Sequence, residues 1–292
     1  KLAPQRGVIE DYFGSKIADN QNTFQLHMIP EDVPNIEELF FKLSRIIEFN
    51  ERKKSNLLKR LKARKPWEPI IISDNLSWEE FSRLNLFLHE IQGIKPVVSV
   101  ARKYNKDGSS SHIIGYVSEV SIKDLENSEF LKEINTPGLK TGKSGLEKYL
   151  NDEMIGKPGL QRFEVNAYGK RIKELKLVQG VVGKDYKITI DQEVQKFATE
   201  LIKDRSGSIC VMDIYTGSII AMHSSPSFDP NLFVFGISQD DWQLIRNNPM
   251  KPLVNKTLQG NYSPGSTIKP IVALSALENG IINTNFTVKC TG

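Results

Sequence analysis

One serine and one lysine in this chain have a spacing that supports nucleophilic catalysis: Ser266 is followed at the third position by Lys269. Residues three apart on a helix share a face, with about 5–6 Å between their Cβ atoms. A serine hydroxyl is a weak nucleophile until a neighbouring base takes its proton, and a neutral lysine amine can be that base. The spacing therefore predicts an acylating serine, Ser266, with Lys269 as its general base.

The surrounding residues indicate how this pair is positioned. Pro264-Gly265 predicts a tight turn that leaves Ser266 at the exposed start of a helix, where backbone N–H groups favour an oxyanion. The helix continues to about Leu277 and is mostly apolar, so we expect a buried central helix whose first turn opens into a cleft. The alternative is a capped helix with an exposed lysine, because Ser-x-x-Lys alone is a weak signal.

The first half of the chain alternates strand and helix patterns. Asn35 and Ser77 each stand three residues before a glutamate, which is typical of a capped helix start. Apolar periodicity and turn residues predict strands at 23–28, 69–73, 97–100 and 113–117, helices at 36–47, 51–65 and 78–92, and a mostly irregular stretch at 136–169 with a short helix at 145–151.

The pattern changes near residue 180. A strand at 187–190 is followed by a helix that Asp191 caps and that runs to 203. Two apolar strands, 208–213 and 218–222, surround a turn and predict an antiparallel hairpin. We place a domain boundary near Leu177, which divides the chain into 1–177 and 178–292.

Composition is that of a folded protein with about two domains. The chain has 292 residues, 25% charged and 39% hydrophobic, with a net charge of +4. This mild basic excess does not point to nucleic acid. No apolar run approaches the ~20 residues of a membrane span. Because the sequence begins at Lys1 and not at Met, we expect an anchor or targeting segment upstream.

Several blocks resemble class B penicillin-binding proteins. The stretch 255–270 resembles their acylation motif, whose nucleophile is the serine of Ser-x-x-Lys. Other blocks resemble further family motifs: 6–11 and 142–149 those of the non-catalytic pedestal, 213–222 the hairpin that opens the transpeptidase domain, 226–231 a second block of high-molecular-mass members, and 229–242 the elongation-specific penicillin-binding protein 2 group. They occur in order along nearly the whole chain, so the chain is identified as a member of this family.

The resemblance implies an α+β fold. An elongated, dimerisation-type pedestal domain at 1–177 would precede the first part of a serine-transpeptidase/β-lactamase-like α/β domain at 178–292. The implied activity is peptidoglycan D,D-transpeptidation during cell-wall elongation through a serine acyl-enzyme on Ser266, with no cofactor and no metal. The family's Ser-x-Asn and Lys-Thr-Gly motifs would follow Gly292, so we expect the chain by itself to be inactive.

The resemblance also implies partners and a location. Stem peptides of peptidoglycan would be the substrates, and β-lactams would acylate Ser266. A membrane-embedded glycan polymerase of the elongation machinery would contact the pedestal. An N-terminal anchor outside this sequence would hold the protein at the periplasmic face of the inner membrane.

Two segments match the missing motifs by letters alone, Ser73-Asp74-Asn75 and Lys140-Thr141-Gly142. Both precede Ser266, whereas the family's motifs follow the nucleophile. The first closes a strand just before a helix cap, where polar turn residues are ordinary. The second lies in a glycine-rich loop. We therefore expect neither to take part in catalysis.

Other features have ordinary structural interpretations. The basic stretch from Arg52 to Lys65 is expected to be a solvated helix face, with an anionic lipid or acidic partner as the alternative. Cys210 is expected in the core, while Cys290 has no evident partner. The four histidines show no ligand pair, and packing is the expected role of His223.

Two other functional classes remain open. The chain could serve as an interaction or scaffold module of the elongation complex that works through 1–177. It could also be a β-lactam sensor or a serine β-lactamase, although a free-standing β-lactamase has no pedestal.

Overall fold

The computed structural model of the chain describes residues 4–47, 49, 51–63, 66–136, 138–165, 171–289 and 291. The chain separates into two compact units, Lys1–Thr257 and Leu258–Gly292. Each unit is described by itself. Cys290 lies outside the described residues, as do Arg64 and Lys65 at the end of the basic stretch.

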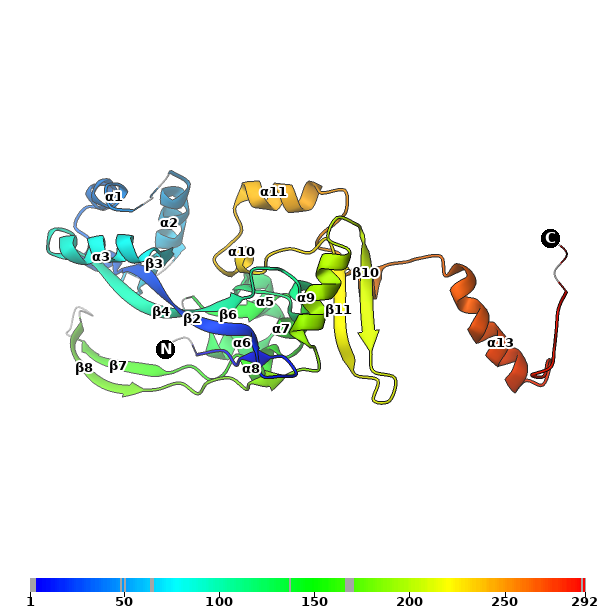
Figure 1. Cartoon of the computed structure of the whole chain (residues 1–292). Helices are drawn as coiled ribbons and strands as arrows, with labels where there is room; N and C mark the ends of the chain where they lie inside the picture. The colour runs from blue at the N-terminus through cyan, green and yellow to red at the C-terminus, as the bar shows by residue number, and fades with distance from the viewer. Residues whose placement is uncertain are drawn as a thin grey trace. The chain divides into compact units, whose positions relative to one another are not determined.

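A five-stranded sheet organises the first unit (Figure 1). Its strands are β1 (Ile9–Glu10), β2 (Lys16–Met28), β3 (Ile70–Leu76), β4 (Ile94–Tyr104) and β9 (Tyr186–Lys187), in the order β3-β2-β1-β9 with β4 paired to β2. The strand expected at 23–28 is longer than predicted. Polar residues 19–22 interrupt its apolar alternation, but β4 pairs with β2 continuously from Ala18 to Met28.

Three helices gather at one end of the β2–β4 pair (Figure 1). They are α1 (Ile36–Ser44), α2 (Glu51–Ala63) and α3 (Trp78–Phe87). The side chain of Asn35 caps α1, and Ser77 and Glu80 form the expected capping box on α3. Their apolar faces cover β2 and β3 in one core that contains Leu26, Met28, Leu43 and Leu84. Short 3₁₀ turns, Pro30–Asp32 and Leu88–Glu90, complete this end of the unit, so α3 ends before the predicted residue 92.

The middle of the chain packs around two further clusters of buried apolar residues. Its elements are α4 (Ser111–Ile114), β5 (Val117–Glu119), α5 (Ile122–Asn127), α6 (Glu129–Ile134), β6 (Lys140–Gly142), α7 (Gly145–Tyr149) and α8 (Asn151–Met154). The strand expected at 113–117 is wrong: residues 113 and 114 belong to the helical turn α4, and only Val117 lies in a strand, β5. Its apolar run is buried against Ile9 and Met154, and a short buried helix gives the same pattern as a strand.

A long hairpin, β7 (Leu160–Val165) paired with β8 (Arg171–Val178), corrects the irregular stretch expected up to 169 (Figure 1). The strand β7 lies within that stretch, and β8 follows directly after it. Glycine and proline at 156–159 favoured a loop prediction. The two strands that follow are nevertheless formed, because they satisfy each other's backbone hydrogen-bonding groups.

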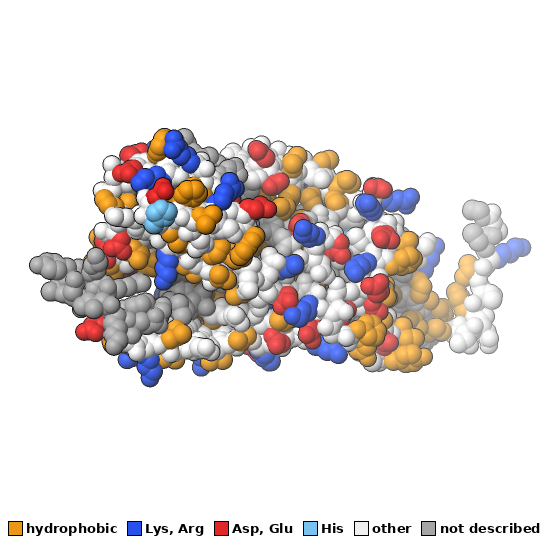
Figure 2. All heavy atoms as spheres, turned by 60° about the vertical axis from the view of Figure 1, so that its left-hand side comes forward, with side chains coloured by type: hydrophobic (Ala, Val, Ile, Leu, Met, Phe, Trp, Pro, Cys, Tyr) orange, Lys and Arg blue, Asp and Glu red, His pale blue; other side chains and the backbone are white. Residues whose placement is uncertain are grey.

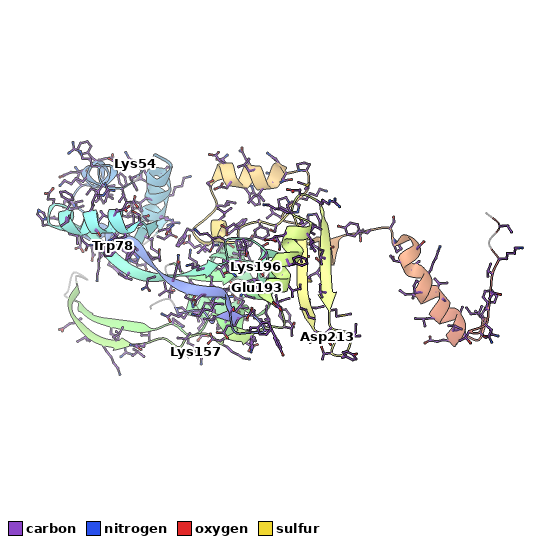
Figure 3. All side chains as sticks on the ribbon, viewed as in Figure 1. Lys54, Trp78, Lys157, Glu193, Lys196 and Asp213 are labelled. Carbon is purple, nitrogen blue, oxygen red and sulfur yellow. The ribbon has the colours of Figure 1, made fainter. Side chains whose placement is uncertain are left out.

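The expected helix and hairpin after residue 190 are both present. Asp191 caps α9 (Gln192–Leu201), and β10 (Gly207–Met212) pairs antiparallel with β11 (Ile219–Ser225). Figure 3 shows Glu193 and Lys196 on α9 and Asp213 at the end of the hairpin. Cys210 on β10 is exposed, which corrects the expected core position, because among the described residues β10 pairs with β11 alone.

Three short helices follow: α10 (Asn231–Val234), α11 (Gln239–Asn247) and α12 (Lys256–Gln259). The second unit then contains a 3₁₀ turn, Gly265–Ile268, and the helix α13 (Lys269–Glu278). The expectation of a buried central helix is not met within this unit. None of the α13 residues is buried, because residues 258–289 supply no second apolar layer.

Candidate active site

Ser266 and Lys269 lie three residues apart, where a 3₁₀ turn passes into a helix. Ser266 is inside the 3₁₀ turn Gly265–Ile268, and α13 begins at Lys269. The backbone N–H of Lys269 donates to the carbonyl oxygen of Ser266. Side chains three apart on a 3₁₀ turn nearly eclipse, so the backbone places the serine and the lysine on the same face, as the spacing predicted.

The turn is specified by its own sequence. Gly265 has a positive φ of 55°, a conformation that other residues adopt at a cost. The hydroxyl of Thr267 donates to the carbonyl of Pro264 and closes the turn on itself. Pro270 is within the first two positions of α13, where a backbone N–H would have no helical acceptor. The proline therefore strains nothing at this point.

Both candidate side chains are exposed, and no hydrogen bond joins them among the described residues. The backbone bond of the 3₁₀ turn agrees with the shared face that the spacing predicted, and a catalytic pairing of the two residues stays a prediction. The cleft that the sequence analysis expected around Ser266 is not formed by residues 258–289 themselves.

The two segments set aside as motif look-alikes lie together in the first unit. Ser73-Asp74-Asn75 is in β3. Lys140-Thr141-Gly142 forms β6, paired with β5, which corrects the glycine-rich loop expected for this segment. Lys140 Nζ lies 3.7 Å from a carboxylate oxygen of Asp74. Both segments line a cleft of about 240 Å³, together with Gln25, Leu57, Arg60, Ile71, Ile72, Glu119, Gly138 and Phe235.

The charged side chains of Lys140 and Asp74 in this cleft interact with other groups of the protein. Burial lowers the pKa of Lys140 and raises the pKa of Asp74, and in each case it outweighs the attraction between the two groups. Lys140 Nζ also donates to the carbonyl of Val234 and lies 4.7 Å from the centre of the Phe235 ring. Lys140 therefore joins three segments of the fold, which is a structural role.

A buried ionic cluster joins the two pedestal-like blocks quoted from the sequence. Glu147 is 0% exposed, and its carboxylate accepts from Arg6 Nε at 2.5 Å and from Arg102 Nε at 2.6 Å. The hydroxyl of Tyr104 also donates to Glu147, and burial with this carboxylate raises the pKa of Tyr104 well above its ordinary value. Asn151 accepts from Arg6, Thr141 and Gly142. This cluster was missed, although Arg6 and Glu147 stand in two blocks that were singled out.

The residues after β11 pack on the middle of the first unit. Asn231 exchanges hydrogen bonds with the backbone N–H and carbonyl of Tyr104. Phe233 stacks on Tyr116 with ring centres 4.2 Å apart. His112 bonds the carbonyl of Pro252 at 2.8 Å, and burial lowers its pKa to about 4. These contacts join residues far apart along the chain, so no local sequence pattern predicted them.

His223 is buried, as expected for a packing residue, with 1% of its surface exposed. Burial lowers the pKa of this imidazole and keeps it neutral at pH 7. Its neighbours include Gln195, which is fully buried and which the sequence analysis also missed. The signal for Gln195 was a polar residue on the inner face of an amphipathic helix.

Among the described residues, no group of three or more His, Cys, Asp or Glu side chains is placed to hold a metal ion. The part of the chain that the structure covers also has no helix with the length and apolar character needed to cross a bilayer. On the face drawn in Figure 2, Lys and Arg side chains are interspersed with Asp and Glu.

Comparison with known families gives two matches in the order expected from the sequence. Residues 1–188 match the penicillin-binding protein dimerisation domain. Residues 207–292 match the penicillin-binding protein transpeptidase domain. Gln195 stands between the two matched segments, and Ser266 lies within the second.

Curated relatives are similar in sequence over nearly the whole length of this chain. A peptidoglycan D,D-transpeptidase MrdA of Escherichia coli is 34% identical over 98% of this chain, and one of Haemophilus influenzae is 33% identical. The chain spans 46% of the first relative and 44% of the second, which is less than half the length of each.

Solved structures show the same fold. A complex between penicillin-binding protein 2 and MreC from Helicobacter pylori aligns with a TM-score of 0.78 and 29% identity, over 98% of this chain and 54% of the other. Penicillin-binding protein 2 of Pseudomonas aeruginosa in complex with WCK 5153 gives a TM-score of 0.63 and 26% identity, over 98% and 43%.

Proposed function

Because this chain belongs to the penicillin-binding protein family, we propose that it is part of a peptidoglycan D,D-transpeptidase whose nucleophile is Ser266. The observation that carries the proposal is the turn Gly265–Ile268, which places Ser266 and Lys269 on one face within the segment that matches the transpeptidase domain. The relatives named as D,D-transpeptidases support the reaction class.

The proposed reaction forms and breaks an acyl-enzyme. The Oγ atom of Ser266 attacks the carbonyl carbon between the two terminal D-Ala residues of a stem peptide, and the amine of Lys269 accepts the hydroxyl proton. The backbone N–H of Ser266 supplies one donor to the oxyanion. The terminal D-Ala leaves with a proton on its amine. The amine of a second stem peptide then attacks the ester and releases Ser266.

A β-lactam would be attacked by the same serine. Opening of the lactam ring leaves an ester on Ser266, because the departing nitrogen stays tethered to the acyl group. The experiment is to label the natural full-length protein with a fluorescent penicillin. We expect wild-type protein to be labelled and the Ser266→Ala variant to stay dark. Label that persists on the alanine variant would remove Ser266 as the nucleophile. Labelling of the 292-residue chain alone tests separately whether these residues suffice.

The remaining assignments rest on the family and on the names of relatives. We place the division between pedestal and transpeptidase portions at 1–177 and 178–292, close to the end of β8. A membrane-embedded glycan polymerase is the partner proposed for the pedestal, and the complex of the Helicobacter pylori relative suggests an MreC-like protein as a second. The periplasmic face of the inner membrane is the proposed location, with a membrane anchor outside this sequence.

A scaffold role for the pedestal is the second candidate. The relatives named as D,D-transpeptidases favour the enzyme over this alternative. Capture of a glycan polymerase by a tagged full-length Ser266→Ala protein would show that binding is independent of acylation.

A further inference from the structure

A buried backbone carbonyl, that of Ser109, is one of the points that tie the segment preceding the proposed nucleophile to the pedestal portion. This residue lies in the loop before α4, inside the segment matched to the dimerisation domain. Two side chains from later in the chain reach the carbonyl oxygen. Gln195 Nε2 donates to it at 2.7 Å, and His223 Nδ1 lies 3.2 Å away.

Gln195 joins this carbonyl to the backbone of β11. Its amide nitrogen also donates to the carbonyl of Met222 at 2.9 Å, and its oxygen accepts from the Met222 N–H at 2.8 Å. The Gln195 side chain therefore pairs with Met222 much as a neighbouring strand would. Because Gln195 is 0% exposed, these bonds have no water to replace them if the amide is removed.

His223 completes the junction. A carbonyl oxygen can only accept, so the contact with Ser109 requires the proton on Nδ1. Thr199 Oγ1 lies 3.3 Å from the same ring nitrogen and donates its own hydrogen to the carbonyl of Gln195. The imidazole thus sits between α9 and the loop before α4, and its tautomer is set by the Ser109 carbonyl.

Two residues of β11, His223 and Ser224, hold the chain just before the second unit. The hydroxyl of Thr257 donates to the carbonyl of His223 at 3.2 Å. The backbone N–H of Lys256 donates to Ser224 Oγ at 2.9 Å, and that hydroxyl donates to the carbonyl of Val254. Residues 254–257 form the stem from which the chain continues to Ser266.

We propose that Gln195 and His223 are positioning residues for acylation: they fix β11 against the Ser109 carbonyl and thereby fix the stem 254–257 that leads to Ser266. This inference rests on the proposed function. It makes the pedestal loop at 107–112 a determinant of the rate at which Ser266 reacts, although that loop supplies no group to the chemistry.

The test measures acylation of the natural full-length protein by a fluorescent penicillin at saturating concentration. The rate constant is separated from the fraction of protein that is finally labelled. Gln195→Met keeps the length of the side chain and removes its three hydrogen bonds. We expect acylation to slow about 10-fold or more, since a displacement near 1 Å can cost up to ~100-fold. The final labelled fraction should match that of the wild type.

His223 offers a rescue pair. His223→Leu removes the donor at Nδ1, whereas His223→Asn keeps an N–H donor near that position. We expect the leucine variant to react about 10-fold more slowly and the asparagine variant to stay within about 3-fold of wild type. The matched control is Lys196→Ala, one residue along α9 from Gln195, which should leave the rate constant unchanged.

A structural role alone would lower the labelled fraction and leave the rate constant of the folded protein unchanged, and that outcome would overturn the proposal. If Gln195→Met does not fold, Thr257→Val removes a single hydroxyl of a half-buried residue and should still slow acylation. A normal rate constant in Thr257→Val would also contradict the inference. Absence of labelling in wild type would instead sink the proposed function.

Discussion

Lys140 and Lys269 each stand in a segment that matches a transpeptidase motif by letters, yet their surroundings differ. Lys140 is largely buried and its amine is held by Asp74, Val234 and Phe235. Lys269 is exposed at the start of α13, on the same face as a serine. A lysine held by three segments of the fold has a structural role, whereas the exposed Lys269 has the position that the proposed proton transfer from Ser266 requires.

The same contrast separates the units that carry them. The first unit buries charged and amide side chains with partners, as Glu147 with Arg6 and Arg102, and Gln195 with Met222. In the second unit every described charged side chain is exposed. The buried polar groups of the first unit therefore stabilise its fold, and substitutions there should mainly affect stability. Substitutions of Ser266 and Lys269 should affect chemistry first.

Substitution of each lysine by methionine should give the largest difference in acylation rate. Lys269→Met should slow acylation by fluorescent penicillin by roughly 10²–10⁴-fold, because general-base catalysis contributes about that much. Lys140→Met should leave the rate constant within about 3-fold of wild type, since this amine only joins parts of the fold. Time courses of gel labelling measure both. A large loss of rate in the Lys140 variant, or none in the Lys269 variant, would reverse the comparison.

Removal of the buried charge at Glu147 is expected to be the largest effect on stability. Glu147→Gln leaves Arg6 and Arg102 without their carboxylate and should lower the free energy of unfolding by about 3–5 kcal/mol. The control is Glu129→Gln, whose pair with Lys132 is exposed and should contribute less than about 1 kcal/mol. Urea unfolding followed by tryptophan fluorescence compares them. Equal losses in both variants would mean that the buried cluster has no special weight.

His112 predicts a dependence of stability on pH. Its pKa is lowered to about 4 in the folded protein, mainly by burial, so the unfolded chain binds the proton more readily. The contribution is complete above the ordinary pKa of about 6.5 and is lost as the pH falls toward 4. At pH 4.5 we expect the folded state to have lost about 2 kcal/mol through this group.

His112→Gln tests that prediction, because the glutamine amide can still donate toward the Pro252 carbonyl and does not titrate. Thermal unfolding between pH 7.5 and 4.5 should show a shallower decline in the variant than in wild type. Parallel curves would mean that His112 does not titrate between the two states.

A helix cap gives the smallest of these effects. Asp191 accepts from the backbone N–H groups of Glu193 and Val194, so Asp191→Ala should cost about 1 kcal/mol of unfolding free energy. Ser144 precedes α7 without a side-chain cap bond, and Ser144→Ala should cost only a few tenths of a kcal/mol. The urea concentrations at the unfolding midpoint compare the stabilities of the two variants. A larger loss at Ser144 would contradict the capping assignment.

Local signals in the sequence were sufficient for part of the fold. The caps at Asn35, Ser77 and Asp191 were predicted because a capping bond involves neighbours along the chain. The β10–β11 hairpin followed from two apolar runs around a turn. The β7–β8 hairpin was missed because its polar and apolar residues do not alternate cleanly. The helical turn α4 was read as a strand because a short buried run has the same composition in both states.

For the candidate site, the sequence by itself determined the pair Ser266 and Lys269 and their common face, since spacing on a turn is a property of adjacent residues. Only the tertiary structure brought Arg6 to Glu147, Lys140 to Asp74, and Gln195 and His223 to the carbonyl of Ser109. These contacts join residues far apart along the chain, and they form where folding has removed the side chains from water. Neither the distance between such residues nor their loss of water is encoded in any short stretch of sequence.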